Sequence, residues 1–394
     1  MKQVIIVTLL TPFLSLLLLN GCVQKTSDYS SDKKLTETRA SLGERLFNDA
    51  SLSRDGIQSC ASCHDSNHAF IDPRHNRSSI DATTPGAVSQ GQDNKSLGDI
   101  NTPSAAYAAL VPDFHFDAEE GLYKGGLFFD GRATNVVEQA KQPFLNPVEM
   151  QSTKSAVVSK VEARYADAMR TLYGANIFDD TESAFHAIAD SIAAFEATAQ
   201  FAPFDSKFDR VLKGEAEFSA EEKLGLELFI DEEKGNCAAC HTVPTADSSK
   251  IDSLFTDFTY DNLGVPKNTL VRSQNGKGQD YVDLGLYNNP QVDDPELKGA
   301  FRVSGLRNIA VTGPYMHNGV FRDLSTTVHF YNSRDVKGAL NPETQAPWEA
   351  AEVPDTMNTE ELGNLGLSLQ EVNAIVAFME TLTDARYLHL IPAR

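Results

Sequence analysis

The spacing of apolar residues repeats along the chain. Residues 42–49 read Leu-Gly-x-x-Leu-Phe-x-Asp, and residues 224–231 repeat that order. Further on, Ser191–Thr198 is matched by Ala374–Thr381, again with apolar residues at helical spacing. Apolar positions three and four residues apart share one face of a helix, so all four stretches predict amphipathic helices. We therefore expect two copies of one helical unit, joined near residues 203–213.

A cysteine motif follows the first predicted helix of each unit. Residues 60–64 read CASCH and residues 237–241 read CAACH. In C-x-x-C-H the two thiols can bond the two vinyl groups of a haem, and the next imidazole can bind its iron. Zinc sites and thioredoxin-like redox pairs also use C-x-x-C, but the immediate histidine favours haem. We expect two c-type haems, attached at Cys60, Cys63, Cys237 and Cys240, with His64 and His241 as proximal ligands.

Long stretches rich in Gly, Pro, Asn and Asp lie between the predicted helices, at residues 66–103 and 242–294. Loops of this length are uncommon in compact domains unless something orders them. A bound group the size of a haem would do so. We therefore predict a mainly α-helical fold of two cytochrome c-like domains, at residues 41–205 and 206–394, each around one covalent haem.

The two halves differ where the opposite face of each iron is expected. Aligned on Gly131 and Gly319, the residue twelve positions later is Pro143 in the first half and Tyr331 in the second. Proline has no side-chain donor atom, whereas a tyrosine oxygen can bind iron. The sequence therefore predicts one open iron and one closed iron.

The chain resembles the bacterial dihaem cytochrome c peroxidases, and within them the MauG-type enzymes. The resemblance spans nearly the whole chain after residue 40. It is carried by the two C-x-x-C-H motifs and by further matching segments. These segments are Asp130-Gly-Arg132, Glu138-Gln139, Asn146-Pro-Val-Glu149-Met150, Leu306-Arg307-Asn308, Pro314-Tyr315 and Gly319.

The resemblance implies that the N-terminal haem reacts with hydrogen peroxide. Gln139 and Glu149 match the family's distal pocket, and Pro143 leaves that side open. A carboxylate can move a proton between the two peroxide oxygens, while an amide can orient peroxide or water. From the residues alone, a solvated loop acid is the favoured interpretation of Glu149.

For the second haem, the resemblance implies an axial ligand at Tyr331, where ordinary members of the family have methionine and MauG-type enzymes have tyrosine. A phenolate favours oxidised iron. Met316 is the alternative ligand, and it would give an ordinary electron-transfer site.

Two departures from the ordinary peroxidases stand out. The loop histidine that closes their first haem should lie eight residues before Asn101, where this chain has Asp93. His68 and His75 lie near the first motif, and we interpret them as loop or propionate-contacting residues. The tryptophan that the family usually places between the haems is Phe129 here, and Trp348 is the only tryptophan in the sequence.

The resemblance also implies a calcium ion between the domains, bound at Asn101, Thr312 and Pro314; oxygen ligands of this kind suit calcium. Homodimers are common in the family.

The net charge and the N-terminal residues indicate which partners and which cellular location to expect. Lys plus Arg number 34 against 55 Asp plus Glu, a net charge of −21, which argues against nucleic acid as a partner. Residues 1–22 predict a secretory signal. Leu19-Asn-Gly-Cys22 resembles a lipobox, so we expect Cys22 to carry lipid and residues 23–40 to form a tether. The protein would then be periplasmic and anchored at the outer membrane. Cleavage without lipidation is the alternative.

Three functions compete at this point. The first is a MauG-like oxidase that uses hydrogen peroxide to oxidise a protein or organic substrate. The second is a cytochrome c peroxidase that detoxifies peroxide with electrons from a small periplasmic cytochrome or copper protein. The third is a non-enzymatic dihaem electron carrier. Glu149, Gln139 and Pro143 favour an enzyme over the carrier, and Tyr331 favours the first function.

Overall fold

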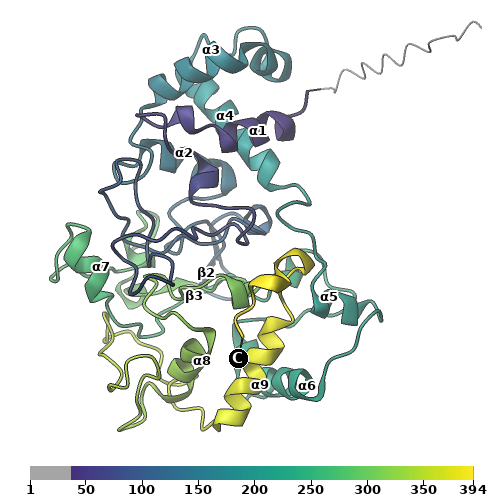
Figure 1. Ribbon diagram of the computed structural model, residues 1–394, viewed down its shortest axis with the longest axis vertical. Coiled ribbons are helices and arrows are strands. Elements are labelled where there is room, and N and C mark those ends of the chain that lie inside the picture. Colours follow the sequence, from purple (N-terminus) through teal and green to yellow (C-terminus); the bar gives the residue numbers. More distant parts are fainter. Residues whose placement is uncertain (1–36, 394) are drawn as a thin grey trace, which may run out of the picture. The chain divides into compact units, whose positions relative to one another are not determined.

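The computed structural model describes residues 37–393 (Figure 1). The predicted signal at residues 1–22, with Cys22, lies outside the described residues, as does the predicted tether up to residue 36. Between residues 37 and 393, no helix combines the length and the hydropathy needed to cross a membrane. Below, residues 37–205 are called the first half and residues 206–393 the second half.

The described chain is mainly helical, as the sequence predicts. Four short strands form two antiparallel two-stranded sheets, in which His115 faces Lys124 and Tyr260 faces Arg302. The sequence did not predict these strands, because two or three residues are too few to show alternation. The helices are α1 (Arg39–Asn48), α2 (Val136–Leu145), α3 (Lys154–Tyr173), α4 (Thr181–Glu196), α5 (Lys207–Leu212), α6 (Ala220–Ile230), α7 (Thr269–Gln274), α8 (Leu324–Ser333) and α9 (Leu369–Glu380); the strands are β1 (His115–Asp117), β2 (Leu122–Lys124), β3 (Tyr260–Asp261) and β4 (Phe301–Arg302).

The predicted repeat is present as two matching helix pairs. Helix α1 packs on α4 in the first half, and α6 packs on α9 in the second (Figure 1). Two of these helices begin with the same capping box: Ser219 with Glu222 starts α6, and Ser368 with Glu371 starts α9. In each box the serine hydroxyl accepts from a free backbone N–H and the glutamate accepts from the serine N–H, which fixes where the helix begins.

A glycine permits each helix crossing. A Cβ atom on Gly43 would lie 1.9 Å from the carbonyl oxygen of Ser191, and a Cβ on Gly225 would lie 1.9 Å from that of Ala374. Any side chain at either position would therefore push the two helices apart. The matching geometry aligns α4 with α9 residue by residue, with Ser191 opposite Ala374 in the alignment.

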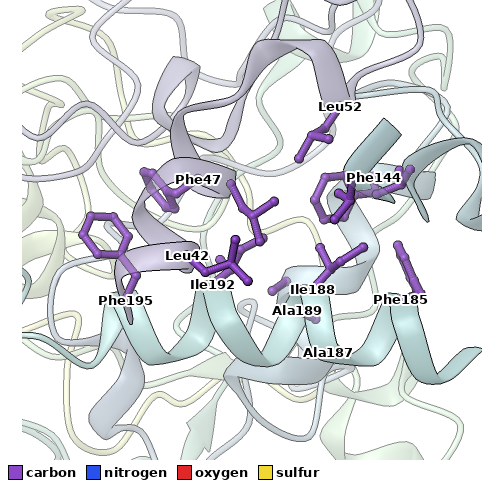
Figure 2. Close-up of a cluster of buried hydrophobic side chains, with 14 of the residues drawn as sticks. Leu42, Phe47, Leu52, Phe144, Phe185, Ala187, Ile188, Ala189, Ile192 and Phe195 are labelled. Carbon is purple, nitrogen blue, oxygen red and sulfur yellow. The ribbon is translucent and has the colours of Figure 1, made fainter. Parts of the chain in front are cut away.

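Each half has its own hydrophobic core around its helix pair. Figure 2 shows Leu42 and Phe47 of α1 lying over α4, whose Ile192 and Phe195 point toward them. In the second half, Phe229 of α6 meets Phe378 of α9 edge to face, with ring centroids 5.2 Å apart. Each fully buried side chain of this size stabilises the fold by about 1.5–3 kcal/mol.

Buried polar contacts join the two halves near the C-terminus. The Tyr107 hydroxyl donates to an Asp384 carboxylate oxygen at 2.7 Å, and the Asn308 side-chain amide donates to the other oxygen at 2.8 Å. Tyr387 donates to the carbonyl oxygen of Ser66 at 2.9 Å. These contacts hold the last turn of the chain between residues of both halves.

The crossing geometry predicts the effect of Gly43→Ala. The added methyl group would overlap the Ser191 carbonyl, and overpacking of this kind costs about 1–3 kcal/mol or more. We expect a lower midpoint in denaturant unfolding followed by circular dichroism. Gly98→Ala is the matched control, because a Cβ there would meet its nearest atom at 3.6 Å, an ordinary contact. Equal midpoints for the two variants would contradict the close crossing.

Candidate functional site

The first cysteine motif forms a tight turn directly after α1. Residues Cys60–Ser62 make one turn of 3-10 helix, and the His64 amide donates to the Cys60 carbonyl at 3.0 Å. The His64 Nδ1 atom lies 2.9 Å from the carbonyl oxygen of Phe70. A carbonyl only accepts, so Nδ1 carries the proton and Nε2 keeps a free lone pair. The ring is thereby oriented as a metal ligand needs to be.

The second motif has the same construction. The His241 amide donates to the Cys237 carbonyl at 2.9 Å, and His241 Nδ1 lies 2.9 Å from the carbonyl oxygen of Phe255. Both accepting phenylalanines have left-handed backbones, with φ of 56° at Phe70 and 57° at Phe255. For a bulky residue this conformation costs about 1–2 kcal/mol. The same strained turn in both halves aims a carbonyl at each histidine.

A single cavity of about 400 Å³ runs along both motifs. Its walls include residues from both halves, which places the two histidine sites in one interior. The predicted site residues among its walls are Cys60, Cys63, His64, Asn101, Gln139, Pro143, Glu149, Cys237, Cys240, His241, Thr312, Pro314, Met316 and Tyr331, with Phe129 also present.

The thiols do not fit the two alternatives to haem. Among the described residues, no group of three or more His, Cys, Asp or Glu side chains is placed to hold a metal ion, whereas structural zinc needs four ligands. Burial raises the pKa of Cys63 and Cys237 to about 12. A redox-active pair needs a thiol with a lowered pKa.

Helix α2 and the turn after it carry the residues that the sequence predicts for the distal side of the first site. Gln139 and Pro143 lie four residues apart on α2 and both line the cavity. Asn146 ends the helix, and its side-chain amide donates to Glu149 Oε1 at 2.5 Å. Burial raises the pKa of Glu149, against the opposing effects of the Arg132 charge and the Asn146 hydrogen bond.

Helix α8 carries Tyr331 to the second site. Asn332 fixes this helix, because its side chain donates to the Leu367 carbonyl at 3.0 Å and accepts from the Leu367 amide at 2.8 Å. Burial, with the nearby cysteines, raises the pKa of the Tyr331 phenol. Met316 lines the same cavity, and both predicted ligands pack against the hydrophobic core of the second half.

Hydrogen bonds of Asn101 and Phe129 join the first half to the second. The Asn101 side chain contacts the Pro314 carbonyl oxygen at 2.5 Å, and its backbone amide donates to the His317 carbonyl at 2.7 Å. The Phe129 carbonyl accepts from the Arg302 amide at 2.7 Å. Two of the three predicted calcium ligands are therefore in contact.

The loop where ordinary peroxidases keep a histidine is closed on itself. Asp93 accepts from the backbone amides of Lys95 and Ser96 at 2.9 and 2.8 Å. His68 bonds Asp65 at 2.9 Å, and His75 is exposed. Neither histidine lines the cavity. Trp348 lies outside the cavity too, packed edge to face on Phe330.

Buried positive groups facing the interior fit the carboxylates of haem. Arg302 lines the cavity, and no carboxylate of the described residues pairs with it. His317 Nε2, on the cavity wall, is buried without a hydrogen-bond partner. Arg272 Nε and Nη1 are also buried without one, while its Nη2 pairs with Glu352 at 3.3 Å. Unpaired donors of this kind are costly unless an acceptor meets them. Together with two cysteine pairs and two oriented imidazoles, they form a donor set that fits two haems.

Several residues of the site escaped sequence analysis. Phe70 and Phe255 act through backbone carbonyls, which leave little trace in side-chain identity. A Phe-x-Asp segment after each motif, at Asp72 and Asp257, is the signal that could have found them. Arg302 and Asn146 became visible only through their positions in the folded chain.

Comparisons with known proteins agree with this geometry. Residues 37–217 match the family model for di-haem cytochrome c peroxidase. The chain is 47% identical to the methylamine utilization protein MauG of Paracoccus denitrificans over 360 residues, 89% of this chain and 90% of the relative. It is 28% identical to cytochrome c551 peroxidase of Pseudomonas aeruginosa, covering 78% of this chain and 76% of the relative.

Among solved structures, the diheme peroxidase BthA from Burkholderia thailandensis superposes with a TM-score of 0.80 at 32% identity, covering 90% of this chain and 88% of BthA. These findings bear out the fold and the two c-type haems that the sequence predicted. The chain therefore belongs to the di-haem cytochrome c peroxidase family and is a mainly helical peroxidase of two cytochrome c-like domains with two c-type haems.

Proposed function

We propose that this peroxidase uses hydrogen peroxide at an open first haem to oxidise a protein or organic substrate, in the manner of MauG, with the second haem relaying electrons. One observation carries the proposal. At matching positions of the repeat, Pro143 of the first half and Tyr331 of the second half both line the cavity. Only the second site then offers the iron a donor on its far side.

At the first site, the attached haem supplies an iron that binds peroxide. His64 would hold that iron through Nε2, with Cys60 and Cys63 as its covalent attachments. Glu149 would move a proton between the peroxide oxygens, and Gln139 would orient the peroxide. A raised pKa lets Glu149 keep a proton to higher pH than an exposed glutamate does. Asn146 holds the carboxyl in place for this task.

At the second site, His241 and Tyr331 would be the axial ligands, with Cys237 and Cys240 attached to the haem. A phenolate ligand stabilises oxidised iron, so this site would give up electrons readily. Met316 is the alternative ligand. Phe129 lines the cavity where the family usually has tryptophan. Because phenylalanine resists oxidation, its ring would not hold an electron hole between the haems.

Cytochrome c peroxidase activity, with a small redox protein as the electron donor, is the second candidate. The likeness to the Pseudomonas enzyme favours it. The turn at Asp93 argues against it, because the described loop has no histidine that could close the first site. A carrier without catalysis would need a Met or His ligand facing His64, and neither type of residue lies beside Pro143 on α2.

The proposed cellular location follows from the predicted secretory signal and lipobox. We propose a periplasmic protein, anchored at the outer membrane by lipid on Cys22, with domains at residues 41–205 and 206–394. Asn101, Thr312 and Pro314 would bind one calcium ion, which the contact between Asn101 and the Pro314 carbonyl supports. A homodimer is compatible with the family.

Glu149→Gln tests the proton role. It keeps the shape of the side chain and removes its proton exchange, so the reaction with peroxide should slow by about 100- to 10,000-fold. Stopped-flow absorbance of the haem bands measures this rate at equal haem content. Glu138→Gln is the control, because Glu138 pairs with Lys141 at 2.6 Å away from the cavity walls. Equal rates in the two variants would remove Glu149 from the mechanism.

Tyr331→Phe tests the second ligand. Loss of the phenol oxygen should change the low-spin spectrum of the second haem and raise its reduction potential, because the donor that stabilised oxidised iron is gone. Met316→Leu should leave both unchanged. Electron paramagnetic resonance and spectroelectrochemistry provide the readouts. The reverse pattern would assign the ligand to Met316.

A further inference from the structure

One buried acid in the cavity has no role in the reaction described above. Glu196 is the last residue of α4, its side chain lines the cavity, and the residue is 6% exposed. Among the described residues, no side chain or backbone group forms a hydrogen bond or ion pair with its carboxyl. A buried carboxylate without a partner is costly, so such a group stays protonated unless a positive charge comes near.

The carboxyl lies beside the first haem attachment point. Burial raises the pKa of the Cys60 thiol, and the negative charge of Glu196 raises it further. The Cys60 sulfur stands for the thioether that bonds the haem. Glu196 is therefore close enough to act electrostatically on the edge of the first haem; the Glu149 charge also acts on Cys60, with a smaller effect.

The repeat supplies an internal comparison. The two helix crossings align Phe195 with Phe378, so Glu196 corresponds to Met379. Met379 is also 6% exposed and lines the same cavity beside the second motif. Two equivalent places thus differ in one respect: the first holds an ionisable group and the second an apolar thioether.

A second, smaller cavity gives Glu196 access to water. It has a volume of about 80 Å³, which is room for water, and its walls include Glu196, Tyr107, Thr198 and the exposed Lys250. The carboxyl thus separates the haem cavity from a cavity that reaches a surface lysine.

Other titratable groups near Glu196 already have partners or lie elsewhere. The Tyr107 hydroxyl donates to Asp384 at 2.7 Å, and Lys250 lies over the Phe204 ring. On α1, which packs against α4, Arg39 and Arg45 pair with Asp190 and Glu37. Glu196 and Tyr107 line both cavities, and of these two only Glu196 has no partner for its polar group among the described residues.

We propose that, at alkaline pH, Glu196 exchanges a proton with solvent through the small cavity when the first haem iron gains or loses an electron. Glu196 takes up one proton from water as the iron takes up one electron from the second haem or a redox partner. It releases that proton when the electron leaves. The proton then cancels the change in charge at the buried site. This inference rests on haem attachment at Cys60, as proposed above.

The sign of the effect follows from this coupling. Burial raises the pKa of Glu196 to about 8. At a pH well below this pKa the Glu196 carboxyl is neutral in both redox states of the iron. At a pH above it the carboxylate stabilises oxidised iron. The reduction potential of the first haem should therefore fall as the pH rises, by at most about 59 mV for each tenfold drop in proton concentration.

The test is a spectroelectrochemical titration of the full-length protein with both haems, between about pH 6 and about pH 9. The wild type should show the falling potential. In Glu196→Gln, which has no carboxylate to stabilise oxidised iron, the potential should be higher and its fall with pH should be smaller. Glu196→Met, which copies the residue of the second half, should behave in the same way. Glu182→Gln, at the exposed start of α4, should keep the wild-type slope.

A pH-indicator dye provides an independent readout. On reduction, Glu196→Gln should take up fewer protons than the wild type, by up to one per protein. Wild-type slope and proton uptake in both Glu196 variants would overturn the proposal. Haem content and the rate of the peroxide reaction are measured on the same samples. The proposed function requires haem and a peroxide reaction, and neither depends on how the potential varies with pH. Failure of the proton exchange can therefore be distinguished from failure of the proposed function.

Discussion

The hydrogen bond between each histidine ring and a phenylalanine carbonyl is the contact on which both sites depend. His64 and His241 each lie 2.9 Å from the oxygen they bond through Nδ1. This contact leaves Nε2 free to bind iron and fixes the plane of the ring. The carbonyls reach the rings because Phe70 and Phe255 adopt left-handed backbones. Buried aromatic packing, such as the stacking of Phe70 on Phe201 at 4.0 Å, offsets that strain.

On this shared scaffold, the chemistry of each site is set by residues that the scaffold does not constrain. The helix crossings at Gly43 and Gly225 are closely matched, and each cysteine pair lies on one turn of 3-10 helix. In the proposed function, Pro143 and Tyr331 make the far sides of the two irons unequal. Glu196 adds a second difference at the haem edge. Duplication therefore supplies two haem sites, and a few substitutions separate their roles.

Much of the fold could be predicted because its signals are local. The repeated Leu-Gly-x-x-Leu-Phe pattern predicts α1 and α6, and the cysteine motifs mark the haem positions directly. The short strands could not be predicted, because β3 and β4 contain two residues each and form through pairing across a long loop.

Prediction of the site was uneven for the same reason. Side chains with distinctive chemistry, such as Tyr331, could be found by aligning the two halves. Partners that act through a backbone carbonyl, such as Phe255, could not. Arg302 and Glu196 are unremarkable in the sequence, since their meaning comes from burial beside a cavity that the chain builds from distant segments.

Electron paramagnetic resonance of the oxidised, untreated protein tests the central claim most directly, because it reports the ligands of each iron separately. An open first haem opposite Pro143 and a closed second haem predict one high-spin and one low-spin ferric signal of equal intensity. Two low-spin signals would contradict the account, because they would require a sixth ligand at the site that Pro143 is proposed to leave open.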